Sequence, residues 1–167
     1  SFTLQNEGYF GMNAVQDNTY TFKTAARSTG DFNSPVKVSL VSSSGKELAC
    51  GDIRGFDMNW QYFTLKLTAS GSDPRAHLEI SGQGSGQLYL DMISLMPDKT
   101  WKNHGLRVDL AEAIDALNPA FLRFPGGCWV EGEDYEHMNQ WKSTIGNGDT
   151  RIPLWNLWGY NVTHGVG

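Results

Sequence analysis

The sequence predicts a mainly β protein, a jelly-roll β-sandwich followed by an incomplete α/β domain. Between about Thr19 and Leu95, short runs of alternating apolar and polar residues recur, separated by Gly, Ser, Asn, Asp or Pro. About six such runs, with no helical spacing among them, are typical of an antiparallel sandwich. After Pro97 the apolar residues change to helical spacing, which indicates a different kind of domain.

The alternating runs place the strands of the sandwich. Every second residue of a run is apolar, so one face of each strand is expected to be buried. The inward residues are Tyr20, Phe22 and Thr24; Val36, Val38 and Leu40; Phe63, Leu65 and Leu67; Leu78 and Ile80; and Leu88, Leu90 and Met92. Turns are expected at residues 43–45, 71–73 and 82–84. Trp60, Tyr62 and Tyr89 lie among these strands, and most of these aromatic residues are expected in the core.

One amphipathic helix and one strand are predicted after the sandwich. The apolar side of the helix is formed by Leu106, Leu110, Ala113, Ile114 and Leu117. Asn118-Pro119 ends the helix, because proline cannot continue it, and an apolar strand follows at residues 120–124. We therefore expect two domains, at residues 1–97 and 98–167. The second is expected to be incomplete, because one helix and one strand cannot cover each other's apolar faces.

Composition excludes several classes of function. The net charge of −5, with scattered Lys and Arg, gives no basic stripe for a nucleic acid. No apolar run approaches the roughly 20 residues of a membrane helix, and the first residues do not have the pattern of a signal peptide. Cys50 and Cys128 have no ligand partners at metal-binding spacing, so no disulfide, metal or cofactor is expected.

Arg123 is the first candidate for a functional residue. It lies in an otherwise apolar strand, directly before a loop that contains Gly126-Gly127. A guanidinium at a strand end can donate hydrogen bonds to sugar hydroxyls or hold a catalytic carboxylate in its ionised form. A structural salt bridge is an equally good interpretation of this residue alone.

A cluster of acidic residues follows the glycine pair. It consists of Glu131, Glu133, Asp134 and Glu136. In isolation these residues could form an acid/base pair or a calcium loop, but they lack the ligand spacing and the glycine of a calcium loop. We interpret the cluster as a solvated loop.

Several segments occur together in an order that resembles one enzyme family. They are residues 6–13 (NEGYFGMN), 90–97 (LDMISLMP), 105–110 (GLRVDL), 122–132 (LRFPGGCWVEG), Trp141-Lys142, Ile145-Gly146, Arg151 and 155–160 (WNLWGY). Together they resemble the family 51 glycoside hydrolases, which are α-L-arabinofuranosidases. The resemblance extends over nearly the whole chain, and it is closest to members with a sandwich domain beside the catalytic barrel.

The resemblance implies a fold and a set of site residues. The sandwich would be galactose-binding-like and similar to a carbohydrate-binding module, the helix would be the first helix of a (β/α)8 barrel, and residues 120–124 would be its second strand. Arg123 would bind the arabinofuranosyl unit, Trp158 would line the substrate cleft, and Cys128 would occupy a neighbouring position. The family's two catalytic glutamates belong to later strands, so no catalytic residue is expected here and the chain alone is expected to be inactive.

The resemblance also implies partners and a location. The substrate would be an arabinose-containing polysaccharide or oligosaccharide, the location would be secreted or periplasmic, and a homo-oligomeric parent remains open. Two alternatives to an enzyme fragment also remain open. The sandwich could be a non-catalytic carbohydrate-binding module, or the chain could be a β-sandwich interaction domain with a helical tail.

Overall fold

The structure is a computed structural model that describes residues 1–123, 126–146 and 151, apart from the side chains of Trp129 and Thr144. The chain divides into two compact units, residues 1–113 and 114–167, which we describe separately. The predicted division after residue 97 stays a prediction. The last strand of the first unit ends at Pro97.

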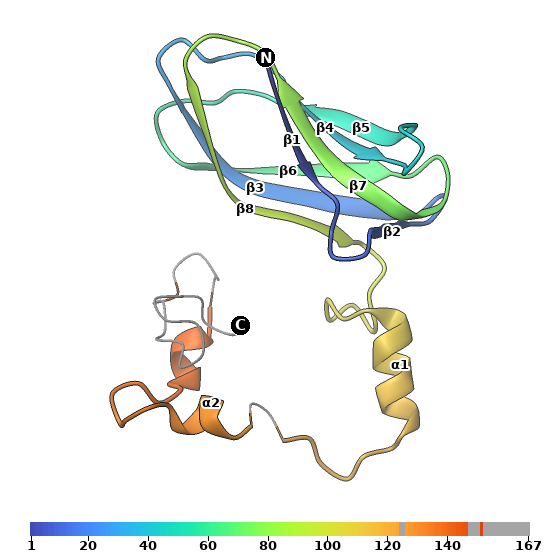
Figure 1. Cartoon of the computed structure of the whole chain (residues 1–167), viewed down its shortest axis with the longest axis vertical. Helices are drawn as coiled ribbons and strands as arrows, with labels where there is room; N and C mark the ends of the chain where they lie inside the picture. Colours follow the sequence, from blue (N-terminus) through green and yellow to red (C-terminus); the bar gives the residue numbers. More distant parts are fainter. Residues whose placement is uncertain (124–125, 147–150, 152–167) are drawn as a thin grey trace. The chain divides into compact units, whose positions relative to one another are not determined.

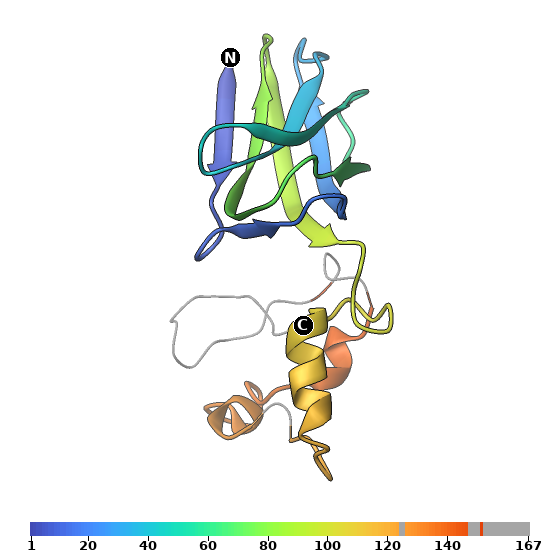
Figure 2. The same cartoon turned by 90° about the vertical axis from the view of Figure 1, so that its right-hand side faces the viewer.

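The first unit is a β-sandwich of two antiparallel sheets packed face to face (Figures 1 and 2). Its strands are β1 (Phe2–Asn6), β2 (Met12–Ala14), β3 (Thr19–Thr29), β4 (Val36–Val41), β5 (Glu47–Ile53), β6 (Gln61–Thr68), β7 (Asp73–Gly82) and β8 (Gln87–Pro97). One sheet has the order β1-β7-β4-β5, with β2 also paired to β7. The other has the order β6-β3-β8. The predicted sandwich is confirmed.

The core lies between the two sheets and follows the predicted alternation. Phe22 of β3, Val38 of β4 and Ile80 of β7 are buried and pack in one cluster with Leu67 of β6. A second cluster, around Tyr20 and Leu40, lies beside it. Burying a side chain of this size contributes about 1.5–3 kcal/mol. The inward residues predicted for these strands are therefore confirmed, while Ser39 and Val41 on the other face of β4 are buried as well.

Strand β5 was not placed by the sequence pattern. Its residues, ELACGDI, lack a clean alternation of apolar and polar side chains. Gly51 lies where β5 faces the other sheet, because a Cβ at this position would lie 2.9 Å from Leu65 Cδ1. A small residue here lets the Leu65 side chain pack close to the β5 backbone. The same glycine interrupts the apolar/polar alternation by which a strand is identified in the sequence.

The prediction that Met92 continues the inward face of β8 is wrong. The pairing of β3 with β8 shifts between Lys23 and Ala25, where one extra residue of β8 is accommodated. Met92 lies at this bulge with φ of 50°, and its side chain is exposed. The Thr24 hydroxyl donates to the Asp91 carbonyl at 2.9 Å and satisfies a group that the bulge removes from the ladder.

The prediction that the sandwich aromatics belong mostly to the core is wrong for three of them. Trp60 is 51% exposed, Tyr62 67% and Tyr89 38%. Tyr62 alternates with Phe63, and Tyr89 alternates with Leu88 and Leu90. Since Phe63, Leu88 and Leu90 pack on the core, the tyrosines must lie on the opposite face.

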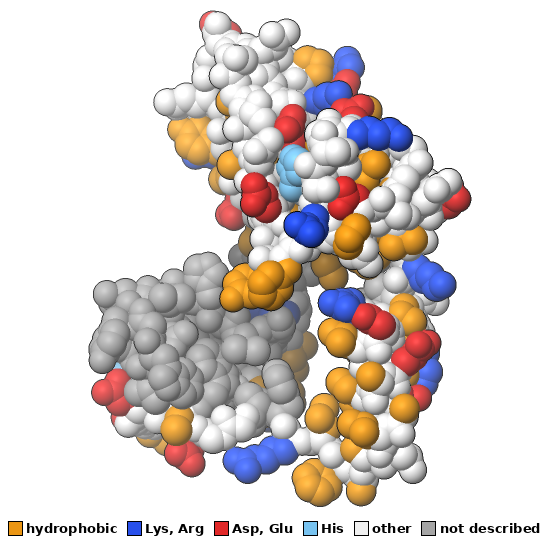
Figure 3. Space-filling view, turned by 45° about the vertical axis from the view of Figure 1, so that its right-hand side comes forward, with side chains coloured by type: hydrophobic (Ala, Val, Ile, Leu, Met, Phe, Trp, Pro, Cys, Tyr) orange, Lys and Arg blue, Asp and Glu red, His pale blue; other side chains and the backbone are white. Residues whose placement is uncertain are grey.

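The predicted helix is confirmed as α1, Val108–Ala116. It ends before Asn118, which has φ of 46° and precedes Pro119. Leu110, Ile114 and Leu117 of its apolar side are exposed, and Figure 3 shows hydrophobic side chains gathered along it. None of the described helices is long and apolar enough to span a membrane.

The strand predicted at residues 120–124 does not form over residues 120–123, and residue 124 lies outside the described part. A strand of a parallel sheet exists only through hydrogen bonds to neighbouring strands, and no strand is paired with this segment in the described residues. The short helices α2 (Cys128–Glu131) and η1 (Trp141–Thr144) follow.

Candidate functional site

Arg123 lies in the second unit with an exposed side chain. Its Nε would be 4.0 Å from a Cβ added to Gly126, so the guanidinium group runs alongside the glycine pair. Gly127 follows with φ of 58°, a conformation that favours glycine, and a Cβ there would meet nothing within 4 Å. Among the described residues, no ion pair occupies Arg123. Its role in binding the sugar stays a prediction.

Cys128 is the first residue of α2 and carries a free, exposed thiol. The loop after α2 turns back sharply and brings the His137 carbonyl against Gly132, where a Cβ would overlap it. Asn139 N–H donates to the Val130 carbonyl at 3.2 Å and closes the loop on the helix. Among the described residues, no hydrogen bond or ion pair joins Cys128 to Arg123, so their shared role stays a prediction.

The acidic cluster forms a solvent-exposed loop. Asp134 accepts a hydrogen bond from His137 N–H at 2.9 Å and lies 2.7 Å from His137 Nδ1. These bonds from His137 lower the pKa of Asp134 below its usual range. Glu131, Glu133 and Glu136 are exposed. No group of three potential metal ligands occurs in the part of the chain that the structure describes.

Trp158 and most of the segment after residue 146 lie outside the described residues. Within this segment the structure describes Arg151, whose Nη2 donates to the Gly146 carbonyl at 3.3 Å. The wall that Trp158 is expected to form therefore stays a prediction.

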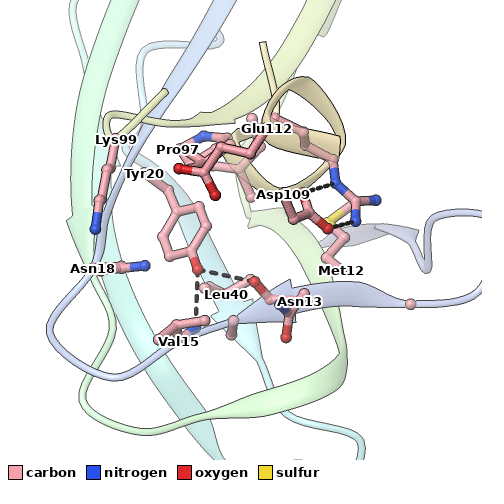
Figure 4. A pocket seen from close by; sticks show the side chains of 15 residues that line it. Met12, Asn13, Val15, Asn18, Tyr20, Leu40, Pro97, Lys99, Asp109 and Glu112 are labelled. Atoms are coloured by element: carbon pink, nitrogen blue, oxygen red, sulfur yellow. Dashed lines mark hydrogen bonds and ion pairs between the residues drawn. The ribbon is translucent and has the colours of Figure 1, made fainter. Parts of the chain in front are cut away.

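A cavity of about 650 Å³ lies in the first unit, at the end of the sandwich near the start of α1 (Figure 4). Tyr20 forms its centre: the hydroxyl donates to the Asn13 carbonyl and accepts from Val15 N–H, both at 2.9 Å. Asp109 and Glu112 of α1 line one side, one helical turn apart. Sequence reasoning missed this cavity, because its walls come from β2, β3, β4, β8 and α1, and only folding brings them together.

The electrostatics of the cavity do not fit a glycosidase active site. The Arg107 guanidinium is hydrogen-bonded to Asp109, with Nε at 2.9 Å from Oδ1, and holds the pKa of Asp109 below its usual range. A retaining glycosidase needs one protonated carboxyl group and one carboxylate about 5 Å apart. Asp109 therefore has no proton to donate near neutral pH. The cavity can hydrogen-bond a polar ligand, but Asp109 does not fit the role of a proton donor.

Comparison with known proteins supports the family predicted from the motifs. Residues 113–167 match the family described as "Alpha-L-arabinofuranosidase 1 domain". Alpha-L-arabinofuranosidase 1 of Arabidopsis thaliana is 35% identical over 98% of this chain and 25% of its own length. The extracellular exo-alpha-L-arabinofuranosidase of Streptomyces chartreusis is 35% identical over 99% of this chain and 21% of its own length.

A solved structure resembles this one over most of the length of this chain. The arabinose-bound α-L-arabinofuranosidase MgGH51 superposes with a TM-score of 0.79 and 32% identity, over 93% of this chain and 27% of that chain. The resemblance to the family 51 arabinofuranosidases is confirmed. This chain spans about a quarter of the length of the curated relatives that it matches.

Proposed function

We propose that this chain is part of a retaining α-L-arabinofuranosidase. The whole enzyme would release terminal non-reducing α-L-arabinofuranosyl residues from arabinose-containing polysaccharides or oligosaccharides. The observation that carries the proposal is the match to MgGH51, which combines 32% identity with a TM-score of 0.79 over 93% of this chain. A match over 93% of the chain extends beyond the sandwich, whose last strand ends at Pro97.

In this proposal the chain supplies binding groups and the rest of the enzyme supplies the chemistry. Arg123 would donate hydrogen bonds to the arabinofuranosyl hydroxyls, Trp158 would pack on the substrate, and Cys128 would lie next to them. The nucleophile and the acid/base group would be two carboxylates about 5 Å apart, contributed by barrel strands outside these 167 residues. Residues 98–167 would form the first part of that barrel, beside a sandwich domain at 1–97.

The surroundings of the enzyme are also part of the proposal. One relative carries the description extracellular, which supports a secreted or periplasmic location for the whole protein. The acidic net charge supports a neutral glycan rather than a nucleic acid as partner. A homo-oligomeric parent stays open.

Arabinose release from an aryl α-L-arabinofuranoside by the full-length protein tests the proposal. We expect turnover by the full-length protein and none by the 167-residue chain. In the full-length protein, Arg123→Ala should lower kcat/KM by about tenfold or more, because a charge-assisted hydrogen bond contributes about 1.5–3 kcal/mol. Arg54→Ala, which removes an exposed arginine paired with Asp52, is the matched control. A folded full-length protein without turnover would contradict the proposal.

The alternative is that the sandwich serves only as a carbohydrate-binding module. The exposed aromatic residues of the sheet β6-β3-β8 favour a binding role for the sandwich. That role is compatible with a hydrolase and does not replace it.

A further inference from the structure

The outer face of the sheet β6-β3-β8 carries an aromatic surface. Because Phe22 and Ala26 of β3 pack in the core, Ala25 and Arg27 lie on the opposite face of the strand, where Ala25 is covered and only 8% exposed. The strand register places Tyr62 of β6 beside Ala25. It also places Asp91 beside Ala25 and Tyr89 beside Arg27, both from β8. Together with Trp60, which precedes β6, we call Arg27, Tyr62, Tyr89 and Asp91 the outer aromatic face.

Arg27 holds two of the rings of this face. Its guanidinium carbon lies 4.5 Å from the centre of the Tyr89 ring and 5.3 Å from that of Trp60. A guanidinium within about 6 Å of a ring centre is attracted to the ring's face. Arg27 Nε is buried and has no hydrogen-bond partner among the described residues, so the two rings are its main neighbours on this face. The three side chains therefore stabilise one another.

Further contacts orient the rings. The Tyr89 hydroxyl donates to Gln87 Oε1 at 2.8 Å. The loop before Trp60 is held by two bonds: Ser28 N–H donates to the Asp57 carbonyl at 2.6 Å, and Asn59 N–H donates to Asp57 Oδ1 at 2.7 Å. Rings held in place before a ligand arrives lose less entropy on binding. Trp60 and Tyr62 still remain mostly exposed.

We propose that the outer aromatic face binds a neutral oligosaccharide of β-linked pyranose units. A pyranose chair with equatorial hydroxyls presents an apolar C–H surface that packs on an aromatic ring, while its hydroxyls need donors and acceptors at the ring's edge. Trp60 and Tyr62 provide the exposed rings. The Arg27 guanidinium can donate and the Asp91 carboxylate can accept beside them. Ala25 lies between Tyr62 and Asp91 in the register, and its short side chain does not project from the centre of the face.

Oligosaccharide binding by this face goes beyond the proposed hydrolase activity, and only its role beside that activity rests on the proposed function. The outer aromatic face has no role in bond cleavage, and it belongs to the sandwich, whereas the Arg123 loop belongs to the second unit. Its function would be to hold the backbone of a polysaccharide from which arabinose is released elsewhere. An open face of this kind binds weakly, and a Kd of about 0.1–5 mM is expected.

Isothermal titration of the 167-residue chain with xylohexaose, cellohexaose and α-1,5-linked arabinopentaose tests the proposal. We expect binding of at least one of the two pyranose ligands. Trp60→Ala and Tyr62→Ala should each weaken it by about tenfold or more, whereas Trp60→Phe should retain most of it. Tyr9→Ala is the matched control: Tyr9 is 92% exposed in the same unit but lies in the connection between β1 and β2. This variant should bind as the wild-type chain does.

Urea unfolding of each variant shows whether a loss of binding comes from a loss of fold. A folded Trp60→Ala variant with wild-type affinity would overturn the proposal, as would equal weakening by Tyr9→Ala. No binding to either pyranose ligand at about 10 mM, or binding to arabinopentaose alone, would overturn it as well. Self-association of the chain that Trp60→Ala abolishes, in the absence of any sugar binding, would assign the face to a protein contact instead.

Discussion

Glu47 is the residue whose ionisation is most affected by folding in the described sandwich. Its Oε2 lies 2.6 Å from Lys37 Nζ and accepts a hydrogen bond from Ser39 Oγ at 3.0 Å. The hydrogen bond from Lys37, with a second from Cys50, lowers the pKa of Glu47 from 4.5 to about 2. The depressed pKa means that this pair stabilises the fold above about pH 4.5, and that the stabilisation is lost as the pH falls toward 2.

Glu47→Gln should lower the free energy of unfolding near neutral pH by less than about 1 kcal/mol, because both partners are more than a third exposed. The difference from wild type should shrink as the pH falls below 4.5 and vanish near pH 2. Urea unfolding at a series of pH values measures it. Lys37→Gln and the double variant complete the cycle. A difference that persists unchanged down to pH 2 would show that the pair does not cause it.

Gly11 combines two reasons to be glycine. It has φ of 95°, and a Cβ at this position would lie 2.5 Å from Arg75 Cα and 2.8 Å from the Pro74 carbonyl oxygen. Backbone atoms cannot give way as the end of a flexible side chain can. Gly45 has a similar φ of 83°, but a Cβ there meets nothing within 4 Å. Comparing substitutions at the two positions therefore distinguishes the energetic cost of positive φ from the cost of steric overlap.

We expect Gly45→Ala to cost about 1 kcal/mol, from the unfavourable φ alone. Gly11→Ala should cost about 1–3 kcal/mol more, because β2 would have to move away from β7. Denaturant midpoints of the two variants measure the difference. Equal losses would mean that the β2 segment relaxes freely.

Single residues also show where sequence reasoning was incomplete. The alternation that correctly put Phe63, Leu65 and Leu67 inside also implies that Tyr62 lies outside. The aromatic character of Tyr62 and Trp60 suggested burial, but in a strand with one buried face the position decides the side, and the residue type does not. The outer aromatic face could therefore have been predicted from the sequence.

At the scale of elements, strands with regular alternation were predictable and irregular ones were not. β3, β4, β6 and β7 follow the pattern, and α1 has its apolar side at helical spacing. β5 was missed because Gly51 interrupts its alternation. The predicted strand at residues 120–124 shows the opposite problem. Its apolar residues fit a strand, but a strand also needs neighbours, and sequence spacing cannot supply them.

The bulge of β8 yields a prediction about Thr24. This buried hydroxyl lies within donating distance of the Asp91 carbonyl, at 2.9 Å, and of the Ala25 carbonyl, at 3.0 Å. Thr24→Val keeps the shape but removes the donor beside the bulge, so stability should fall by about 1–3 kcal/mol. Thr64→Val, on the exposed face of β6, should change stability by less than about 0.5 kcal/mol. Thermal or urea unfolding compares the two, and equal effects would contradict this role of the hydroxyl.

At the scale of the whole molecule, motif order predicted the family, but not the surfaces that the fold creates. The segments that resemble the family are local, so they can be read from the sequence in order. The cavity around Tyr20 needs five elements to converge, and no single segment carries its signature. The predicted site residues fall between these cases: Arg123 and Cys128 are described and exposed, while the pocket that would join them requires the other strands of a barrel.

The apolar side of α1 is exposed and gives a last prediction. Leu110, Ile114 and Leu117 are each more than half exposed. An exposed apolar stripe on a helix binds hydrophobic dyes and promotes association. Leu110→Lys combined with Leu117→Lys should therefore lower the fluorescence of bound 1-anilinonaphthalene-8-sulfonate and reduce concentration-dependent association. The urea midpoint of the sandwich should stay unchanged, since its core clusters do not include these residues. Asp115→Lys alone, on the charged side, changes the net charge by the same amount as the two leucine substitutions and should leave dye binding as it was. Dye binding that responds equally to the single and the double variant would mean that net charge, and not the apolar stripe, controls it.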